Sequence, residues 1–302
     1  MRAYNSYRSY LRKKFGRPVL KVPLNGGFCC PNRDGTLDRR GCSFCDNRSF
    51  SPVAETSASM SAQLDAAIKK APLKHAAFLA YLQPFSNTYG SVDYLRSIYE
   101  PILAVPQVVG LAIGTRPDCF DESTYAYLGE VNRRTYLSVE LGLQSSHNAT
   151  LARIRRGHTW EDFVQTVNML HSLSIETAVH VMLGLPGEQR SHMICTAQRL
   201  AGLPVRGIKI HQLMIISGTD LETEYRRYDV AAPGLEAYAA LLAEFLSFVR
   251  PDQHIHRLMA SAQQHHGLIA PLWSSDKMRS INYIQSYLRE HCVQQGSAFR
   301  SG

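Results

Sequence analysis

The sequence predicts an α/β protein built on a partial or complete (β/α) TIM-like barrel with a small C-terminal extension. Short apolar or β-branched runs alternate with helical stretches along most of the chain. Nearly every polar or glycine-rich motif follows directly after one of these apolar runs. With 302 residues, of which 45% are hydrophobic, the chain can also bury a substantial core.

The predicted strands are the apolar runs themselves. They are Val19–Leu24, Ala76–Leu82, Val108–Ile113, Tyr136–Leu141, Thr177–Leu183, Gly207–Leu213 and Ile255–Met259. Because helical stretches separate them, we expect parallel strands joined by crossover helices. An open doubly wound sheet is the competing architecture, which periodicity alone does not exclude.

The chain divides into three predicted parts. Residues 1–18 form a basic N-terminal helix that Gly16 ends, and residues 19–231 form the core barrel. Residues 232–302 form the C-terminal extension, which begins with a helix over Leu235–Phe248 and is expected to close over the barrel.

The net charge of +8 is concentrated in residues 1–33, which contain no acidic residue. The basic residues of this block are Arg2, Arg8, Arg12, Lys13, Lys14, Arg17, Lys21 and Arg33. Such a block attracts polyanions, and the interleaved Tyr4, Tyr7, Tyr10 and Phe15 offer faces on which bases could stack. RNA is therefore a candidate partner. An amphipathic helix whose basic face is simply solvated explains the same pattern equally well.

The sequence indicates a cytoplasmic protein without a membrane partner. No run approaches the roughly 20 apolar residues of a membrane span, and no charged start leads into an apolar stretch of signal-peptide type. The acid-poor start resembles an organellar transit peptide, but it runs into the first strand without a cleavable spacer. The seven cysteines are an odd number and include a metal-type spacing, which favours a reducing compartment.

Three cysteines form the strongest chemical motif. Cys30, Cys42 and Cys45 are spaced C-x11-C-x2-C in a loop rich in Gly, Asn and Asp. A four-iron cluster normally takes four cysteines, so three would leave one iron open to an external ligand. Structural zinc is the alternative, with a histidine from elsewhere as its fourth ligand.

The polar motifs that follow the strands are predicted to meet in one place. They are the cysteine loop, QPFSNT, GTRPD, GLQS and GLPGE. In (β/α) barrels the loops at the carboxyl ends of the strands form a single active-site mouth. We therefore expect one site rather than five.

The cysteine loop GGFCCPNRDGTLDRRGCSFCDNRSF resembles the cluster loop of the YhcC/YtqA family of radical S-adenosylmethionine (SAM) proteins. The similarity continues in the family's order through YLQPFSNTY, VGLAIGTRPDCF, VELGLQS, RIRRGHT, MLGLPGE, IKIHQL, HRLMASA and LIAPLW. In that family Ser commonly precedes the first ligand, which favours Cys30 over Cys29. The resemblance implies a radical SAM barrel with a [4Fe-4S] cluster on Cys30, Cys42 and Cys45. The eleven-residue gap is wider than the usual three but matches this subgroup.

A wider resemblance, to the radical SAM domain of Elongator's catalytic subunit and to oxygen-independent coproporphyrinogen oxidases, implies the SAM contacts. In those relatives the Gln of the G-x-Q-S motif and the Arg twelve residues later hold SAM, which here are Gln144 and Arg156. An arginine can form a bidentate pair with the SAM carboxylate, and a glutamine offers a donor and an acceptor. Alternatively, Arg156 is a surface charge beside Arg153 and Arg155.

The resemblance implies further SAM contacts near the ends of the second to fifth strands and on the loops that follow them. They are Gln83, Asn87, Thr88, Arg116, Glu140 and Gly184. Many relatives carry a carboxylate where this chain has Gly114, a departure that affects the loop of Arg116. Glu140 could instead pair with a basic neighbour inside the barrel, and Gly184 could simply form a tight turn.

The resemblance implies reductive cleavage of SAM to a 5'-deoxyadenosyl radical, with an electron donor such as flavodoxin or ferredoxin. Family members have been linked to the side chain of the wobble uridine in tRNA, so tRNA is the expected substrate. A small metabolite or porphyrin substrate is one alternative, and a zinc-stabilised RNA-binding module is another. His211, His256 and Arg257 are candidates for facing the substrate as proton donors or anion binders, although a histidine in such a place is often structural.

Overall fold

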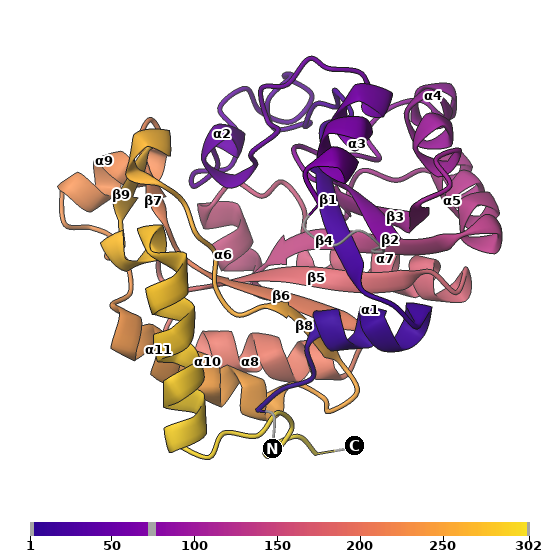
Figure 1. Cartoon of the computed structure of the whole chain (residues 1–302). Helices are drawn as coiled ribbons and strands as arrows, with labels where there is room; N and C mark the ends of the chain where they lie inside the picture. The colour runs from indigo at the N-terminus through magenta and orange to yellow at the C-terminus, as the bar shows by residue number, and fades with distance from the viewer. Residues whose placement is uncertain (1–2, 72–76, 301–302) are drawn as a thin grey trace.

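The computed structural model describes residues 3–71 and 77–300 and shows a curled sheet of seven parallel strands (Figure 1). The strands are β1 (Val19–Leu24), β2 (Ala77–Leu82), β3 (Val108–Thr115), β4 (Tyr136–Gln144), β5 (Glu176–Leu183), β6 (Gly207–Gln212) and β8 (His254–Arg257). All predicted strands are present with small shifts at their ends, and Ala76 lies outside the described residues. The strands lie side by side in chain order, without the reversal that marks a doubly wound sheet. The fold is therefore a partial TIM-like barrel, with β1 and β8 at its edges.

Helices pack against the outer face of the sheet (Figure 1). α3 (Met60–Lys69), α4 (Val92–Leu103), α5 (Glu122–Arg134) and α7 (Trp160–Ser172) contact its strands. α8 (Arg190–Ala201) and α10 (Leu235–Phe248) pack on each other and join the same core, α11 (Lys277–Glu290) packs on α10, and α6 (Asn148–Arg153) follows β4. Side-chain caps fix several starts: Thr159 and Asp162, for example, form a capping box at α7. None of the described helices is long and apolar enough to cross a membrane.

Alternation along the strands separates the apolar core from a polar lumen. Val139, Leu141 and Leu143 of β4 belong to the core that the helices cover. Glu140, which lies between Val139 and Leu141, and Gln144, which follows Leu143, line a cavity inside the barrel. Because successive side chains of a strand point to opposite faces, this pattern directs the polar residues of the buried strands into the lumen.

Helix α1 (Tyr7–Phe15) closes the amino-terminal end of the barrel. Ser6, its N-cap, pairs with Ile255 of β8, and Leu11 packs on lumen residues of β2 and β3. The Lys14 ammonium lies 2.7 Å from the carboxylate of Glu176, the first residue of β5. The basic helix and the cysteine loop, which follows the carboxyl end of β1, therefore lie at opposite ends of the strands.

The Tyr7 ring of α1 is buried in the barrel, so the stacking expectation is wrong for Tyr7, whereas Tyr10 is partly buried and its stacking on RNA stays a prediction. The Tyr7 ring stacks on His256 with centroids 3.7 Å apart, and the Tyr10 ring lies 4.3 Å from that of His254. Both rings pack against histidines of β8 at the amino-terminal opening of the barrel. The basic side chains face solvent, which matches the amphipathic-helix alternative. They are Arg8, Arg12, Lys13, Lys14 and Arg17.

The segment after residue 232 both packs against the sheet and adds to it. Helix α10 has the predicted bounds, and β8 pairs in parallel with β6. An antiparallel pair, β7 (Ile215–Ile216) with β9 (Leu268–Ala270), was not predicted, because such short strands carry no readable period. The short helices are α2 (Asn47–Phe50), α9 (Asp220–Arg226), η1 (Gln264–His266) and η2 (Leu272–Ser275).

Candidate active site

One cavity of about 180 Å³ extends from the carboxyl ends of the strands into the lumen. Eight of the residues predicted to hold the cluster or SAM line it, and so do His211 and Arg257. The eight are Cys30, Cys42, Cys45, Gln83, Arg116, Glu140, Gln144 and Arg156. These residues come from the cysteine loop and from β2, β3 and β4 or the loops that follow them. The structure thus brings the dispersed motifs together at one site.

The cysteine loop is folded by backbone hydrogen bonds that turn it around its thiols. The amide of Arg33 donates to the carbonyl of Cys30 at 2.8 Å, and the amide of Cys45 donates to that of Cys42 at 3.0 Å. Gly41, just before Cys42, has a φ of 79°, which favours glycine. Cys29 is exposed and lies outside the cavity lining, so Cys30 is the member of this pair that faces the site.

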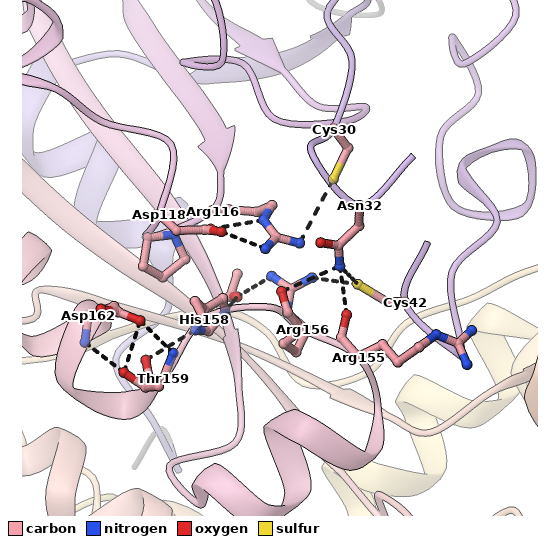
Figure 2. Close-up of polar contacts among 12 residues, drawn as sticks. Cys30, Asn32, Cys42, Arg116, Asp118, Arg155, Arg156, His158, Thr159 and Asp162 are labelled. Carbon is pink, nitrogen blue, oxygen red and sulfur yellow. Dashed lines mark hydrogen bonds and ion pairs between the residues drawn. The ribbon is translucent and has the colours of Figure 1, made fainter. Parts of the chain in front are cut away.

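Positive and polar groups surround the Cys42 thiol (Figure 2). The Nη1 of Arg156 lies 3.1 Å from Cys42 Sγ, and the Nδ2 of Asn32 lies 3.4 Å from it. Burial opposes ionisation of this thiol, but the charges of Arg156 and Arg116 outweigh burial and lower the pKa of Cys42. Burial, followed by the negative charge at Cys42, raises the pKa of Cys45 to about 11. The loop is therefore prepared to hold thiolate at Cys42.

Arg116 is held at the site by its neighbour. Its Nε and Nη2 donate to the two carboxylate oxygens of Asp118 at 2.9 and 2.7 Å, and its side chain is only 3% exposed. This bidentate pair leaves Nη1 directed toward Cys30, 3.9 Å from Sγ (Figure 2).

Gln144 and Arg156 carry buried polar atoms that lack a partner in the described part of the chain. They are Gln144 Oε1 and Arg156 Nε. Gln144 also has a φ of 78°, an uncommon backbone conformation for a non-glycine residue, which often marks a functional site. Arg156 Nη2 donates to the Gly142 carbonyl at 2.5 Å, and a Cβ at Gly142 would lie 3.0 Å from that atom. Glycine at position 142 thus lets Arg156 approach β4.

These features fit a cluster with an external ligand. Among the described residues, no group of three His, Cys, Asp or Glu side chains is placed to hold one metal ion. A four-iron cluster binds each thiolate to a different iron atom, so three thiols spread around a loop suit it. Buried polar atoms are nearly always hydrogen-bonded in native proteins, so the unpartnered atoms of Gln144 and Arg156 suit a polar ligand beside the cluster.

Three residues expected at the SAM site lie outside the cavity lining. Asn87 donates to backbone carbonyls, including that of Gly114 at 2.8 Å, and Thr88 bonds the Thr115 hydroxyl at 2.6 Å. Gly184 occupies a turn with a φ of 91°. Asn87 and Thr88 therefore brace the ends of β2 and β3, and a SAM contact for these three residues stays a prediction.

Gly114, where many relatives carry a carboxylate, lies in a place with little room for a side chain. A Cβ at this position would lie 3.1 Å from the backbone oxygen of Leu82, which is tighter than ordinary contact. A carboxylate side chain like that of the relatives would require β2 and β3 to separate slightly.

Glu140 pairs with basic groups at the bottom of the cavity. Its fully buried carboxylate accepts from Lys21, from Lys209 at 3.0 Å, from His180 at 2.9 Å and from His256 at 3.1 Å. Burial opposes ionisation of Glu140, but the two ammonium groups hold its pKa well below the usual range. This is the alternative that the sequence left open for Glu140.

Sequence reasoning missed four polar residues of the site: Asn32, Lys21, His180 and Lys209. Asn32 donates to the backbone of Arg155 and Arg156 as well as to Cys42, so it ties the cysteine loop to the arginine loop. The other three could have been found, because a lysine or histidine inside an otherwise apolar strand of a buried sheet is expected to face a polar lumen.

Comparisons with known proteins agree with this geometry. The Radical SAM superfamily profile matches residues 37–200, and the Radical SAM C-terminal domain profile matches residues 205–290. The uncharacterized protein YtqA of Bacillus subtilis is 36% identical over 300 residues, covering 98% of this chain and 93% of that protein.

Two further similarities are more distant. A tRNA uridine(34) acetyltransferase of Methanocaldococcus jannaschii is 31% identical over 125 residues, covering 39% of this chain and 22% of that protein. The solved structure of Methanocaldococcus infernus Elp3 with an N-terminal deletion superposes with a TM-score of 0.65 at 16% identity, covering 92% of this chain and 63% of that one. The structural match shows a shared fold. Together with the profile matches and the full-length similarity to YtqA, it shows that the chain is a radical SAM enzyme of the family that includes YtqA and YhcC.

Proposed function

We propose that this enzyme modifies the C5 side chain of the wobble uridine in tRNA, using one [4Fe-4S] cluster held by Cys30, Cys42 and Cys45. The observation that carries the substrate is the segment shared with proteins named as tRNA uridine(34) acetyltransferases. A wobble base lies in a single-stranded loop and can be splayed into a cavity without melting a duplex.

Superfamily membership implies the cluster and SAM, which together supply a 5'-deoxyadenosyl radical that abstracts hydrogen. The protein's own part is to position the reactants and exclude water. Arg156 and Gln144 would hold the polar groups of SAM through their unpartnered atoms, with Gln83 nearby in the lining. Arg116 and Arg156 would compensate the negative charge of the thiolates. Flavodoxin or ferredoxin remains the proposed electron donor.

RNA would approach from the cysteine end of the barrel rather than along α1. A hollow that shares Cys42 and Cys45 with the cavity is lined by four arginines, which suit contacts with phosphates. They are Arg33, Arg40, Arg48 and Arg155. Ion pairs with Asp38, Asp46 and Asp220 hold three of them in place.

Nucleoside mass spectrometry of total tRNA tests this function. A deletion strain should lose or accumulate a C5-substituted wobble uridine, and the wild-type gene should restore it whereas a Cys42→Ala gene should not. An unchanged tRNA profile in the deletion strain would contradict the tRNA assignment and leave the enzyme class intact.

A small metabolite or porphyrin is the second candidate substrate. The observation in its favour is that the basic face of α1 lies at the end of the barrel opposite the cysteines, so it does not line a path for RNA into the cavity. Salt-sensitive binding of unmodified tRNA, weakened by Arg40→Gln and Arg48→Gln, would favour RNA. The zinc-stabilised RNA-binding module loses support, because the superfamily assignment indicates an enzyme.

A further inference from the structure

The floor of the cavity, formed by Glu140, His180, Lys209, His211 and Arg257, has more positive than negative charge. All five residues line the cavity, and Glu140 is their one carboxylate. Two ammonium groups, those of Lys21 and Lys209, already pair with Glu140. Each of its oxygens accepts from one ammonium and one imidazole, so Glu140 is saturated.

Arg257 is the third cation of this group, and Glu140 already pairs with the other two. A register shift between β6 and β8 pairs Ile208 with Ile255 but Lys209 with Arg257, which brings the arginine beside the lysine. In the described part of the chain, the side chain of Arg257 has no ion pair or hydrogen bond, and its Nε is buried without a partner. Arg257 as a whole is partly buried and lines the cavity, and a cation that no carboxylate balances there attracts an anion.

His211 gives a second observation in favour of an anion at the cavity floor. It lies two residues after Lys209 on β6, and its buried Nε2 has no partner among the described residues. Burial and the charge of Arg257 hold the pKa of His211 well below its ordinary value, so its neutral ring can donate one hydrogen bond. Arg257 and His211 thus leave two polar atoms unpartnered at the floor.

The geometry points to an anion subsite at the cavity floor, in which Arg257 and His211 bind a carboxylate carried by the substrate. Lys21, Lys209 and Arg257 meet a single carboxylate there, a formal excess of two positive charges, and burial lowers the pKa of both lysines, which reduces this excess. That excess suits one carboxylate better than a phosphate dianion. The inference deepens the proposed function, because it specifies an acidic group on the substituent that enters the barrel.

Small fluorinated probes can test the subsite on the reconstituted holoenzyme with saturating SAM, which occupies its own carboxylate site. ¹⁹F NMR titration should show saturable binding of trifluoroacetate and none of trifluoroacetamide, its neutral counterpart. Arg257→Gln should weaken trifluoroacetate binding about tenfold or more, because it removes a charged hydrogen-bond partner. Arg257→Lys should restore part of it, and the matched change Arg279→Gln, at an exposed position on α11, should have no effect.

Several outcomes would overturn the subsite. Equal binding of trifluoroacetamide would show that the site does not require a negative charge. Equal losses of trifluoroacetate binding in Arg257→Gln and Arg279→Gln would show that Arg257 is not where the anion binds. Loss of SAM affinity in Arg257→Gln would assign the arginine to SAM instead. Competition by inorganic phosphate at lower concentration than acetate would replace the carboxylate with phosphate. Thermal unfolding of each variant identifies a folding defect. If Arg257→Gln is misfolded, the binding of trifluoroacetate by Arg257→Lys decides the test.

A nucleoside pair separates the subsite from the tRNA assignment. If both are correct, 5-carboxymethyluridine should bind at least about tenfold more tightly than 5-carbamoylmethyluridine, and Arg257→Gln should abolish the difference. If trifluoroacetate binds but neither nucleoside does, the subsite stands and the uridine substrate falls. If neither trifluoroacetate nor the carboxylated nucleoside binds, the subsite falls, whatever the tRNA profile of the deletion strain shows.

Discussion

At the scale of single residues, the site depends on side chains that do two tasks. Arg156 contacts both Cys42 and the carbonyl of Gly142, and it lines the cavity with an Nε that has no partner in the described part of the chain. Asn32 links the same thiol to the backbone of the arginine loop. Charge compensation at the cysteines and recognition of a ligand therefore use the same groups.

Replacing Cys42 with alanine should abolish the cluster, because three thiolates are the fewest that hold a four-iron cluster with one open iron. Anaerobically reconstituted Cys42→Ala is expected to lose its iron, its sulphide and its visible absorbance, with SAM cleavage reduced about 100-fold or more. Cys29→Ala is the control, since Cys29 is exposed and outside the cavity lining. Zinc in the wild-type protein, or equal effects of the two variants, would contradict the assignment.

Arg156→Gln should weaken SAM binding roughly 10- to 100-fold, the usual effect of losing a hydrogen bond to a charged group. Anaerobic equilibrium dialysis with SAM measures this, and the iron content confirms that the cluster is retained. Arg153→Gln provides the comparison, because Arg153 pairs with Glu224 at the surface and is 46% exposed. Unchanged SAM affinity in Arg156→Gln would assign the arginine to the thiolates alone.

At the scale of elements, α1 and β8 together close the barrel at its amino-terminal end. Ser6 pairs with β8, and the Tyr7 ring covers His256, which in turn bonds Glu140. The helix therefore shields the buried charges of the cavity floor from solvent. Its basic residues are a consequence of its outer position.

Tyr7→Ala should destabilise the protein by about 3 kcal/mol or more, because it removes a large buried ring from a packed site. Denaturant unfolding followed by circular dichroism measures the change. Arg8→Ala, at the exposed neighbouring position, should alter stability by no more than about 0.5 kcal/mol. Weaker RNA binding by Tyr7→Ala at unchanged stability would instead restore a stacking role for this tyrosine.

At the scale of the whole molecule, the histidines buried inside the barrel make the folded state less stable in acid. Burial is the main cause that lowers the pKa of His180 to about 3 and that of His256 to about 4. Both rings are neutral in the folded protein near neutral pH, whereas in the unfolded chain they titrate at about 6.5. Between about pH 6.5 and 4 the unfolded chain thus binds more protons, and folding weakens as the pH falls.

The free energy of unfolding should therefore drop between pH 6.5 and 5.0, by at most about 1.4 kcal/mol per pH unit for each histidine whose pKa burial lowers, which are His158, His180, His211, His254 and His256. Guanidinium unfolding at pH 6.5, 5.75 and 5.0 measures the slope. His256→Phe keeps a ring against Tyr7 and should make the slope shallower by about one proton. The same change at exposed His265 serves as the control, and an equal slope in His256→Phe and wild type would exclude His256 as a source.

Much of the fold could be predicted, but the site only in part. The strands were predicted because buried parallel strands are continuous apolar runs, and their residues alternate cleanly between core and lumen. The partners of Glu140 could not be predicted, because Lys21, His180, Lys209 and His256 come from four strands far apart in sequence. Asn87 shows the converse problem: its motif suits a ligand contact, yet its amide is used by backbone carbonyls.

The sequence by itself determined the barrel class, the family, the three cysteines and the loops that meet at the cavity, since these depend on local pattern and spacing. Only the tertiary structure decided that the barrel is partial and that α1 closes its far end with Tyr7 and Tyr10 against the barrel. It also decided that, among the described residues, the Arg257 side chain has no partner while Glu140 has four. The physical reason is that charge pairing and burial depend on which strands become neighbours. That information lies in the register and curvature of the sheet rather than in any one segment of the chain.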